Sequence, residues 1–398
     1  VPTNIPEAGA DQHTGGRSPT DGRAGVLLAR GCRERAKPLS GNRATNCFSA
    51  SLALGSTDLT RASRMTRMAD NPQHDQQGTP TGNEEIMDQA WRKESVHGTA
   101  YELTYAGALS FLRRKYSRDL QRVDIAVSGV PFDSAVTYRP GTRLGPRAVR
   151  AASVQLAELK GFPFGFDPFE TLAVVDFGDC ALDPHSPLSV PDAIENHARS
   201  ILAADTAMLT IGGDHFIAYP LIKAHAAKHG PVALLQFDAH CDTWASSGPL
   251  DHGTMFLSAV NEGLIDVDHS IQVGLRTHND IDVGMQVLSA PWVHRHGIDA
   301  TLDAISKRVG DRPVYLSFDI DVLDPAFAPG TGTPVSGGLA TWQALELIRG
   351  LGAINMIGMD LVEVSPPFDH AEITAIAAAT VAHDWLCVMA ERRQKGLW

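Results

Sequence analysis

Short apolar runs alternate with longer amphipathic segments along the chain from residue 123 to its end. Runs rich in Val, Ile and Leu are typical of strands buried on both faces of a parallel sheet. We predict strands at 123–130, 172–175, 206–211, 232–237, 270–275, 314–318 and 355–360. We predict helices at 146–160, 191–204, 216–228, 302–309, 341–351 and 372–392. The alternation predicts an α/β fold, with a single three-layer α/β/α domain around a mostly parallel, doubly wound sheet.

The first 85 residues have a different pattern. Residues 1–67 are rich in Gly, Ser, Thr, Asn and Arg and show no sustained apolar periodicity, and residues 69–85 are polar. We expect residues 1–85 to be a disordered N-terminal extension, or one derived from sequence upstream of the natural start, for which Met68 is a candidate. An organelle transit peptide is the alternative. Glu7, Asp11 and Asp21 count against it, because transit peptides are poor in acidic residues.

Three of the predicted strands are each followed by a block of aspartate and histidine. The blocks are Gly-Gly-Asp-His at 212–215, Asp-Ala-His-Cys-Asp at 238–242 and Asp-Ile-Asp at 319–321. Ligands of open α/β sheets bind beyond the carboxyl ends of the strands, so we expect the three blocks to lie at one edge. Carboxylates buried there are costly unless positive charge neutralises them. The candidate metal ligands are His215, Asp238, His240, Asp242, Asp319 and Asp321.

Four carboxylates and two imidazoles suit a pair of divalent cations. The spacing of two within 238–242 and 319–321 puts alternate side chains on one side of an extended segment. Two metals about 3.5–4 Å apart can share a water molecule and lower its pKa toward neutrality, which gives a nucleophile at ordinary pH. The alternative is that these residues only cap strand ends, and three such blocks in one chain disfavour it.

Composition narrows the class of partner. The formal net charge is -12 and the sequence pI is about 5.7, which argues against nucleic acid and is compatible with a small cationic substrate. No apolar run approaches the length of about 18 residues that is needed to span a bilayer, so we expect no membrane contact. The five cysteines are widely spread and form no CxxC pair, which favours reduced thiols and a cytoplasmic protein.

The three polar blocks resemble the signature of the ureohydrolases, the arginase and agmatinase family, which has GGDH, DAHxD and SFDxDxxDP in this order. The resemblance covers roughly residues 123–390. Further segments are similar to the agmatinase-like branch, at 129–133, 139–146, 251–256, 329–334 and 359–364. The resemblance implies an arginase-like catalytic domain at 123–398. It also implies that 86–122 is an N-terminal arm, which either contacts a neighbouring subunit or packs on its own domain through an amphipathic stretch at 103–112.

The resemblance also implies a role for each candidate ligand. One metal would be held by His215, Asp238, Asp242 and Asp319, and the other by His240, Asp238, Asp319 and Asp321. In this arrangement Asp238 and Asp319 bridge the two metals. Water activated between them would attack a guanidino carbon and release urea and an amine. Mn²⁺ is the expected metal and Ni²⁺ the alternative.

Residues outside the ligand set are also implicated by the resemblance. Glu363 matches the carboxylate that pairs with the substrate guanidinium, because a carboxylate fits the forked donors of that planar cation. His252 matches the histidine that carries protons to the leaving amine, which suits a pKa near neutrality. Asp214 is expected to orient other groups. Thr333 is a candidate to support Glu363 or the substrate, and Trp244 a candidate to border the pocket.

Agmatine is the expected substrate, and the alternatives are guanidinobutyrate, guanidinopropionate, guanidine and metformin. Met285 and the charge-poor loop 244–250 depart from the agmatinase pattern, and only Asp251, Asp280 and Asp282 offer an acidic wall for a cationic tail. The family resemblance implies a homo-trimer or hexamer, with a related second subunit as a further possibility. Two other readings remain, a supporting subunit of a hetero-oligomer and a metal-dependent deacetylase with one zinc ion.

Overall fold

The computed structural model describes residues 89–398 apart from 93–94, 99–102, 158, 246–247 and 249. The described residues all belong to one compact unit, Gln77–Trp398, which is the second of the two units of the chain. Our expectation for residues 1–85 therefore lies outside the described residues.

A nine-stranded sheet forms the centre of the second unit, with the strand order β1-β3-β2-β4-β9-β8-β5-β6-β7. All of the pairings between these strands are parallel. The strands are β1 (Lys115–Tyr116), β2 (Ile125–Val130), β3 (Val174–Asp179), β4 (Ala207–Gly212), β5 (Ala233–Phe237), β6 (Ile271–Leu275), β7 (Gln286–Ser289), β8 (Val314–Asp319) and β9 (Met356–Val362). The predicted parallel sheet is confirmed.

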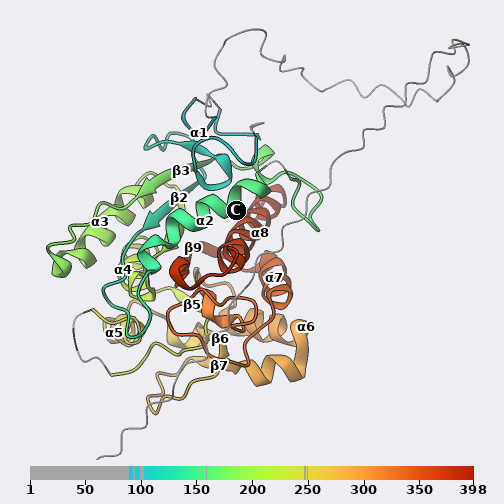
Figure 1. Ribbon diagram of the computed structural model, residues 1–398. Helices are drawn as coiled ribbons and strands as arrows, with labels where there is room; N and C mark the ends of the chain where they lie inside the picture. Colours follow the sequence, from blue (N-terminus) through green and yellow to red (C-terminus); the bar gives the residue numbers. More distant parts are fainter. Residues whose placement is uncertain (1–88, 93–94, 99–102, 158, 246–247, 249) are drawn as a thin grey trace, which may run out of the picture. The chain divides into compact units, whose positions relative to one another are not determined.

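Helices cover both faces of this sheet (Figure 1). They are α1 (Gln89–Arg92), α2 (Gly145–Ser153), α3 (Val190–Leu202), α4 (Ala218–His229), α5 (Met255–Asn261), α6 (Ala290–Val309), α7 (Thr341–Arg349) and α8 (Ile373–Gln394). Successive side chains of one strand enter different cores. Leu235 belongs to the core cluster that includes residues of α2, α6, α7 and α8, and Leu234 belongs to the cluster that includes residues of α3, α4 and α5. Because a strand turns successive side chains to opposite faces, two cores require two helical layers. The three-layer α/β/α class is confirmed.

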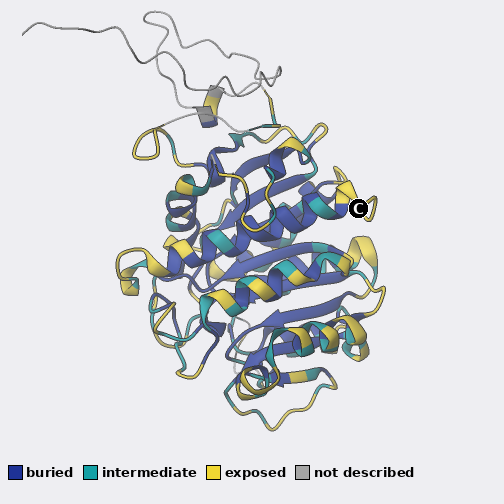
Figure 2. Ribbon diagram, turned by 90° about the vertical axis from the view of Figure 1, so that its right-hand side faces the viewer, coloured by how far each residue is buried: buried dark blue, intermediate teal, exposed yellow. Residues whose placement is uncertain are grey.

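The burial pattern follows from this layering. The strands at the centre of the sheet are buried along almost their whole length, and the helices expose only their outer faces (Figure 2). Strands covered on both sides need apolar residues at nearly every position, which explains the continuous apolar runs of the sequence.

Several elements differ from their predicted bounds. The helix predicted at 146–160 is α-helical only to Ser153 and continues as a 3₁₀ turn. The helix predicted at 302–309 is the last part of α6, which is interrupted where Gly297 takes a φ of 82°. Strands β1 and β7 and helix α5 were not predicted, because they are short and lack a strong apolar period. In the arm, Phe111 and Leu112 are buried in a 3₁₀ turn, whereas Leu103 and Leu109 are exposed, so the predicted amphipathic stretch does not form a helix.

One expectation from the sequence needs correction. Among the described residues, α8 is long and apolar enough to cross a membrane by length and composition. However, 83% of its most apolar window is buried inside the fold. The helix packs against α2 and α7, so its apolar character is explained by its position in the core.

Candidate metal centre and active site

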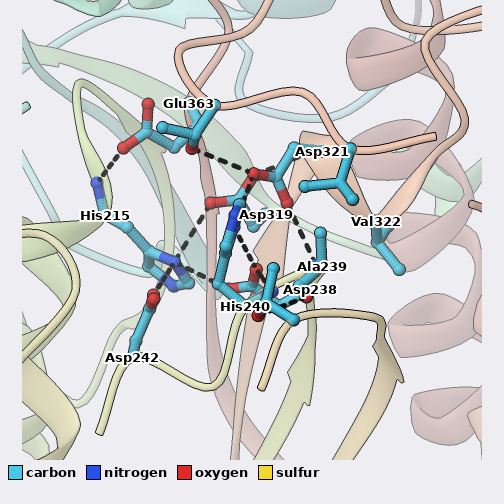
Figure 3. A network of polar contacts seen from close by, with 12 residues as sticks. His215, Asp238, Ala239, His240, Asp242, Asp319, Asp321, Val322 and Glu363 are labelled. Carbon is cyan, nitrogen blue, oxygen red and sulfur yellow. Dashed lines mark hydrogen bonds and ion pairs between the residues drawn. The ribbon is translucent and has the colours of Figure 1, made fainter. Parts of the chain in front are cut away.

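The predicted ligands come from the carboxyl ends of three strands, β4, β8 and β5, and Glu363 follows β9, which lies between β4 and β8 in the sheet. Figure 3 shows the side chains of these ligands together with Glu363. Strands β4 and β5 come earlier in the sequence than β8 and β9, but in the sheet β9 and β8 lie between β4 and β5. His215 follows β4, Asp238 follows β5, Asp319 ends β8, and Glu363 follows β9. Segments far apart in the sequence therefore meet at one edge, as the rule for open α/β sheets predicts.

One group of ligand atoms surrounds the ring of His215. Its Nδ1 lies 3.0 Å from Asp238 Oδ2, 2.9 Å from Asp242 Oδ2 and 3.1 Å from Asp319 Oδ2. All of these side chains are buried. Asp242 reaches the group from a left-handed backbone conformation with a φ of 53°. Such strain in a non-glycine residue is common at functional sites.

A second group lies beside the first and shares Asp238 with it. His240 Nδ1 lies 3.0 Å from Asp321 Oδ2 and 3.5 Å from Asp238 Oδ1. Asp238 thus offers a different oxygen to each histidine. Asp319 contributes Oδ2 to the first group, and its Oδ1 accepts a hydrogen bond from the amide of Asp321 at 2.8 Å. Bridging by Asp238 agrees with these contacts, and bridging by Asp319 stays a prediction.

A buried hydrogen-bond chain fixes the tautomer of His215. Its Nε2 lies 2.8 Å from Ser317 Oγ, and that hydroxyl donates to Asp360 Oδ1 at 2.7 Å. Tyr315 donates to the other oxygen of Asp360 at 2.8 Å. Because the serine proton is used on Asp360, Nε2 of His215 carries the hydrogen and Nδ1 presents a lone pair.

The donor set fits a divalent cation. Nδ1 of His215 is buried and has no hydrogen-bond partner among the described residues, although three carboxylate oxygens surround it. A lone pair that faces carboxylate oxygens is repulsive unless the ring is protonated or a metal cation lies between them. Burial favours the neutral ring, but the three carboxylates outweigh it and raise the pKa of His215 well above its usual range. Nitrogen and oxygen donors of this kind are ligands for manganese, nickel or zinc.

The electrostatics of the site lead to the same conclusion. Burial raises the pKa of Asp242 to about 7, and the neighbouring Asp238 contributes to the shift. Burial likewise raises the pKa of Asp319 well above its usual range. For His240, burial favours the neutral ring, but Asp321 and Asp238 outweigh it and raise the pKa to about 12. The site therefore demands positive charge, which two divalent ions would supply.

Glu363 is the carboxylate beside the ligand groups. Its side chain is buried, and its backbone is left-handed with a φ of 66°. Oε1 accepts from the amide of His215 at 2.9 Å and contacts His252 Nδ1 at 2.8 Å. Oε2 is buried and has no hydrogen-bond partner among the described residues. A Cβ at Gly332 would lie 2.8 Å from Oε2, so the glycine keeps space around this oxygen.

His252 is held between Glu363 and the loop after β2. Its Nε2 accepts from the amide of Thr137 at 3.1 Å and lies 2.9 Å from the Thr137 hydroxyl. The neutral ring therefore carries its proton on Nδ1, which donates to Glu363. Burial alone would lower the pKa of His252, but the charge and hydrogen bond of Glu363 outweigh it and raise the pKa to about 9.

A cavity of about 300 Å³ opens onto His252, which contacts Glu363, and onto part of the ligand set. Its lining includes His240, Asp242, Asp319 and His252, together with Trp244, Asp251, Thr137 and Thr333. Trp244 borders the pocket as we expected. Thr333 donates to Asp321 Oδ2 at 3.3 Å rather than to Glu363. A larger cavity of about 410 Å³, around Lys228 and Arg393, lies at the opposite edge of the sheet and contains none of the candidate ligands.

Some functional contacts were missed by the sequence reading. The amide of Ala135 donates to Asp214 Oδ2 at 2.9 Å, which fixes the loop that carries Thr137. Burial, together with the charge of Glu363, raises the pKa of Asp214 well above its usual range. Tyr315 and Ser317 are polar residues two apart in a buried strand. This spacing was a signal for the hydrogen bonds that hold His215 through Ser317 and Asp360. Nothing in the local sequence indicated Thr137.

Comparison with known proteins places the chain in a family. The model described as "Arginase family" matches residues 123–387, so the chain belongs to the arginase family. It is a ureohydrolase, an enzyme of guanidino C–N bonds. An agmatinase of Chromobacterium violaceum is 61% identical over 312 residues, which cover 78% of this chain and 97% of that protein.

Solved structures agree with this assignment. A crystal structure of a hypothetical agmatinase from Burkholderia thailandensis is 61% identical, with a TM-score of 0.76 over 77% of this chain and 99% of the other. The proclavaminate amidino hydrolase of Streptomyces clavuligerus is 38% identical, with a TM-score of 0.68 over 73% of this chain and 99% of the other. The arginase-like class of the fold is thereby confirmed.

Proposed function

We propose that this ureohydrolase is an agmatinase, which hydrolyses agmatine to putrescine and urea. The observation that carries the proposal is the unpaired buried oxygen of Glu363, which lies beside two ligand groups that share Asp238. A buried carboxylate oxygen needs a donor, and a guanidinium supplies two N–H groups in one plane. Relatives that are 48–61% identical and carry the name agmatinase support the same substrate.

Two divalent ions would use the ligands in two overlapping sets. His215, Asp238, Asp242 and Asp319 would hold one ion, and His240, Asp238, Asp319 and Asp321 the other. When bound, such a pair lowers the pKa of a shared water molecule toward neutrality and so supplies the nucleophile. We propose Mn²⁺ as the resident metal, with Ni²⁺ as the alternative, because the carboxylate-rich set suits manganese.

Glu363 would bind and orient the guanidinium. Its Oε1 is held by the amide of His215, which fixes the carboxylate relative to the first ligand group. Its Oε2 has no partner among the described residues, and its lone pairs can accept N–H groups from one edge of the planar cation. Orientation of this kind brings the guanidino carbon into line with the nucleophile and reduces the entropy cost of reaction.

His252 would move the proton that the leaving amine needs. It contacts Oε1 of Glu363, the oxygen that also accepts from the His215 amide, so its ring lies beside the proposed guanidinium site. The pKa of about 9 favours a protonated ring at neutral pH, in which Nε2 no longer accepts from the Thr137 amide but can donate to the Thr137 hydroxyl. An imidazolium at that position can act as a general acid toward the departing nitrogen.

The charge of the cavity supports a cationic substrate over the anionic alternatives. Among its described lining residues there is one aspartate that is not assigned to metal, Asp251, and no lysine or arginine. Guanidinobutyrate and guanidinopropionate would bring a carboxylate into this cavity without a partner. Guanidine and metformin lack the amine tail of agmatine, and the urea-release assay described below compares them with agmatine as substrates. The two ligand groups disfavour a deacetylase with one zinc ion.

We propose a catalytic domain at 123–398 with an arm at 86–122, a cytoplasmic location and a homo-trimer or hexamer. The reduced state expected of the cysteines supports the location. The buried thiols of Cys180, Cys241 and Cys387, which form no disulfide, agree with it.

Urea release from the purified protein tests the proposed function. Agmatine, guanidinobutyrate, guanidinopropionate, arginine, guanidine and metformin are each supplied with Mn²⁺ and with Ni²⁺. We expect urea from agmatine at a kcat/KM at least tenfold above that for any other substrate. Preferential cleavage of a carboxylate-tailed substrate would contradict the proposal, as would no urea from agmatine with both metals bound.

A further inference from the structure

We propose that Asp251 and Trp244 form a tail-binding wall, which selects guanidino substrates that carry a second positive charge. The inference rests on the proposed function and deepens it, because it names the residues that read the far end of the substrate. Both side chains line the same cavity as His240 and His252. A substrate whose guanidinium reaches Glu363 from this cavity must leave its tail against the remaining lining.

The carboxylate of Asp251 is held in place and is not a predicted metal ligand. Its Oδ1 accepts from the amide of Gly253 at 2.8 Å, a local turn that fixes the side chain. The side chain is half-buried, so it faces the cavity without losing all contact with water. A partly desolvated carboxylate attracts an ammonium group more strongly than a fully exposed one does.

Trp244 is braced from several sides. Its amide donates to the carbonyl of Gly253 at 3.1 Å, and its indole Nε1 donates to the carbonyl of His278 at 3.3 Å. A Cβ at Gly253 would lie 3.1 Å from the ring, so the glycine permits the indole to lie this close to the turn. The ring centroid is 6.0 Å from that of His240, which places the indole next to the second ligand group.

An aromatic face next to a carboxylate is a recognised environment for an ammonium group. The indole offers the strongest cation–π face among the side chains, and the carboxylate adds a direct charge. Two of the three aspartates that line the cavity, Asp242 and Asp319, are assigned to metal. Asp251 is therefore the acid left for the tail among the described lining residues.

The other two acids considered from the sequence do not line this cavity. Asp280 is exposed and pairs with His278 at 3.0 Å. Asp282 accepts from the amide of Gly284 at 2.8 Å and borders a different cavity, behind Cys241. Asp280→Asn thus removes the same charge from the same region without changing the proposed wall, and serves as a matched control.

The test compares Asp251→Asn with wild type on agmatine and on pentylguanidine, in which a methyl group replaces the ammonium. Asparagine keeps the oxygen that accepts from Gly253, so the turn is retained. We expect kcat/KM for agmatine to fall about five- to tenfold, mainly through KM, which corresponds to about 1–1.4 kcal/mol. The value for pentylguanidine should change less than about twofold. Asp280→Asn should match wild type on both substrates.

Two results would overturn the inference while leaving the proposed function intact. One is an equal loss on agmatine and pentylguanidine, which would mean that Asp251 acts on His252 or on the fold. The other is a wild-type enzyme that cleaves both substrates with the same kcat/KM. No urea from agmatine in wild type, with both metals bound, would instead contradict the proposed function. Bound metal is measured in every variant, so a loss of ligands is recognised separately.

Discussion

Removal of the Ser317 hydroxyl tests how the first metal position is built. In Ser317→Ala the Nε2–H of His215 loses its acceptor at 2.8 Å, and Asp360 loses a donor at 2.7 Å. The ring can then rotate or exchange tautomers, so Nδ1 no longer presents its lone pair reliably to the carboxylates. His240 pairs with Asp238 and Asp321, whereas the Ser317 hydroxyl bonds to His215 and Asp360, so the second ligand group should be unaffected.

The expected size of the effect follows from the burial of the pair. An unsatisfied buried donor costs about 1–3 kcal/mol. Loss of a partner that orients a metal-bound histidine typically weakens metal binding about 10- to 100-fold. We therefore expect one of the two metal affinities to fall by about 10- to 100-fold and the other to change less than about threefold.

Calorimetric titration of the metal-free protein with Mn²⁺ measures both affinities. Ser128→Ala is a matched control, because Ser128 is also buried in a strand and lies 2.6 Å from a ring nitrogen of His197, which is not a candidate ligand. The control should bind both metals as wild type does. Equal weakening of both metals in Ser317→Ala, or no weakening of either, would refute the reasoning.

Three further variants test separate roles. Asp238→Ala should reduce metal content at both positions, because its two oxygens face different histidines; retention of one metal at full occupancy, by elemental analysis, would contradict this. Glu363→Gln should keep both metals, since an amide oxygen can still accept from the His215 amide, but kcat/KM for agmatine should fall about 100-fold or more. The pKa of His252 is raised, so its proton is present below about pH 9 and lost above it, and kcat should decline above that pH. His252→Asn should lower kcat about 100-fold and abolish this alkaline limb, and an unchanged pH profile would remove His252 from the proton transfer.

Much of the site was predictable from the sequence because it depends on strand ends. Asp238 and Asp319 each end an apolar run, and parallel strands bring their carboxyl ends to one edge whatever the strand order. The spacing of two between ligands then sets which side chains share a face. The same reasoning located His215, whose block follows the apolar run of β4.

Other features depend on contacts that the sequence does not encode locally. The bond between Ser317 and Asp360 requires that β8 and β9 be neighbours in a particular register, in which these residues are paired. The contact of Thr137 with His252 joins two loops that are far apart in the chain. Asp251 lines the cavity and Asp280 does not, and this difference depends on the paths of their two loops. The sequence suggested an acidic residue for the cationic tail but could not tell which aspartate lines the cavity.

The most direct test of a two-metal agmatinase is to measure bound metal and urea release together. Metal-stripped protein is titrated with Mn²⁺, and the rate of urea formation from agmatine is recorded at each step. We predict that the rate reaches its plateau only as the second equivalent per chain binds. Full activity with one metal per chain, or two bound metals without urea from agmatine, would contradict the mechanism.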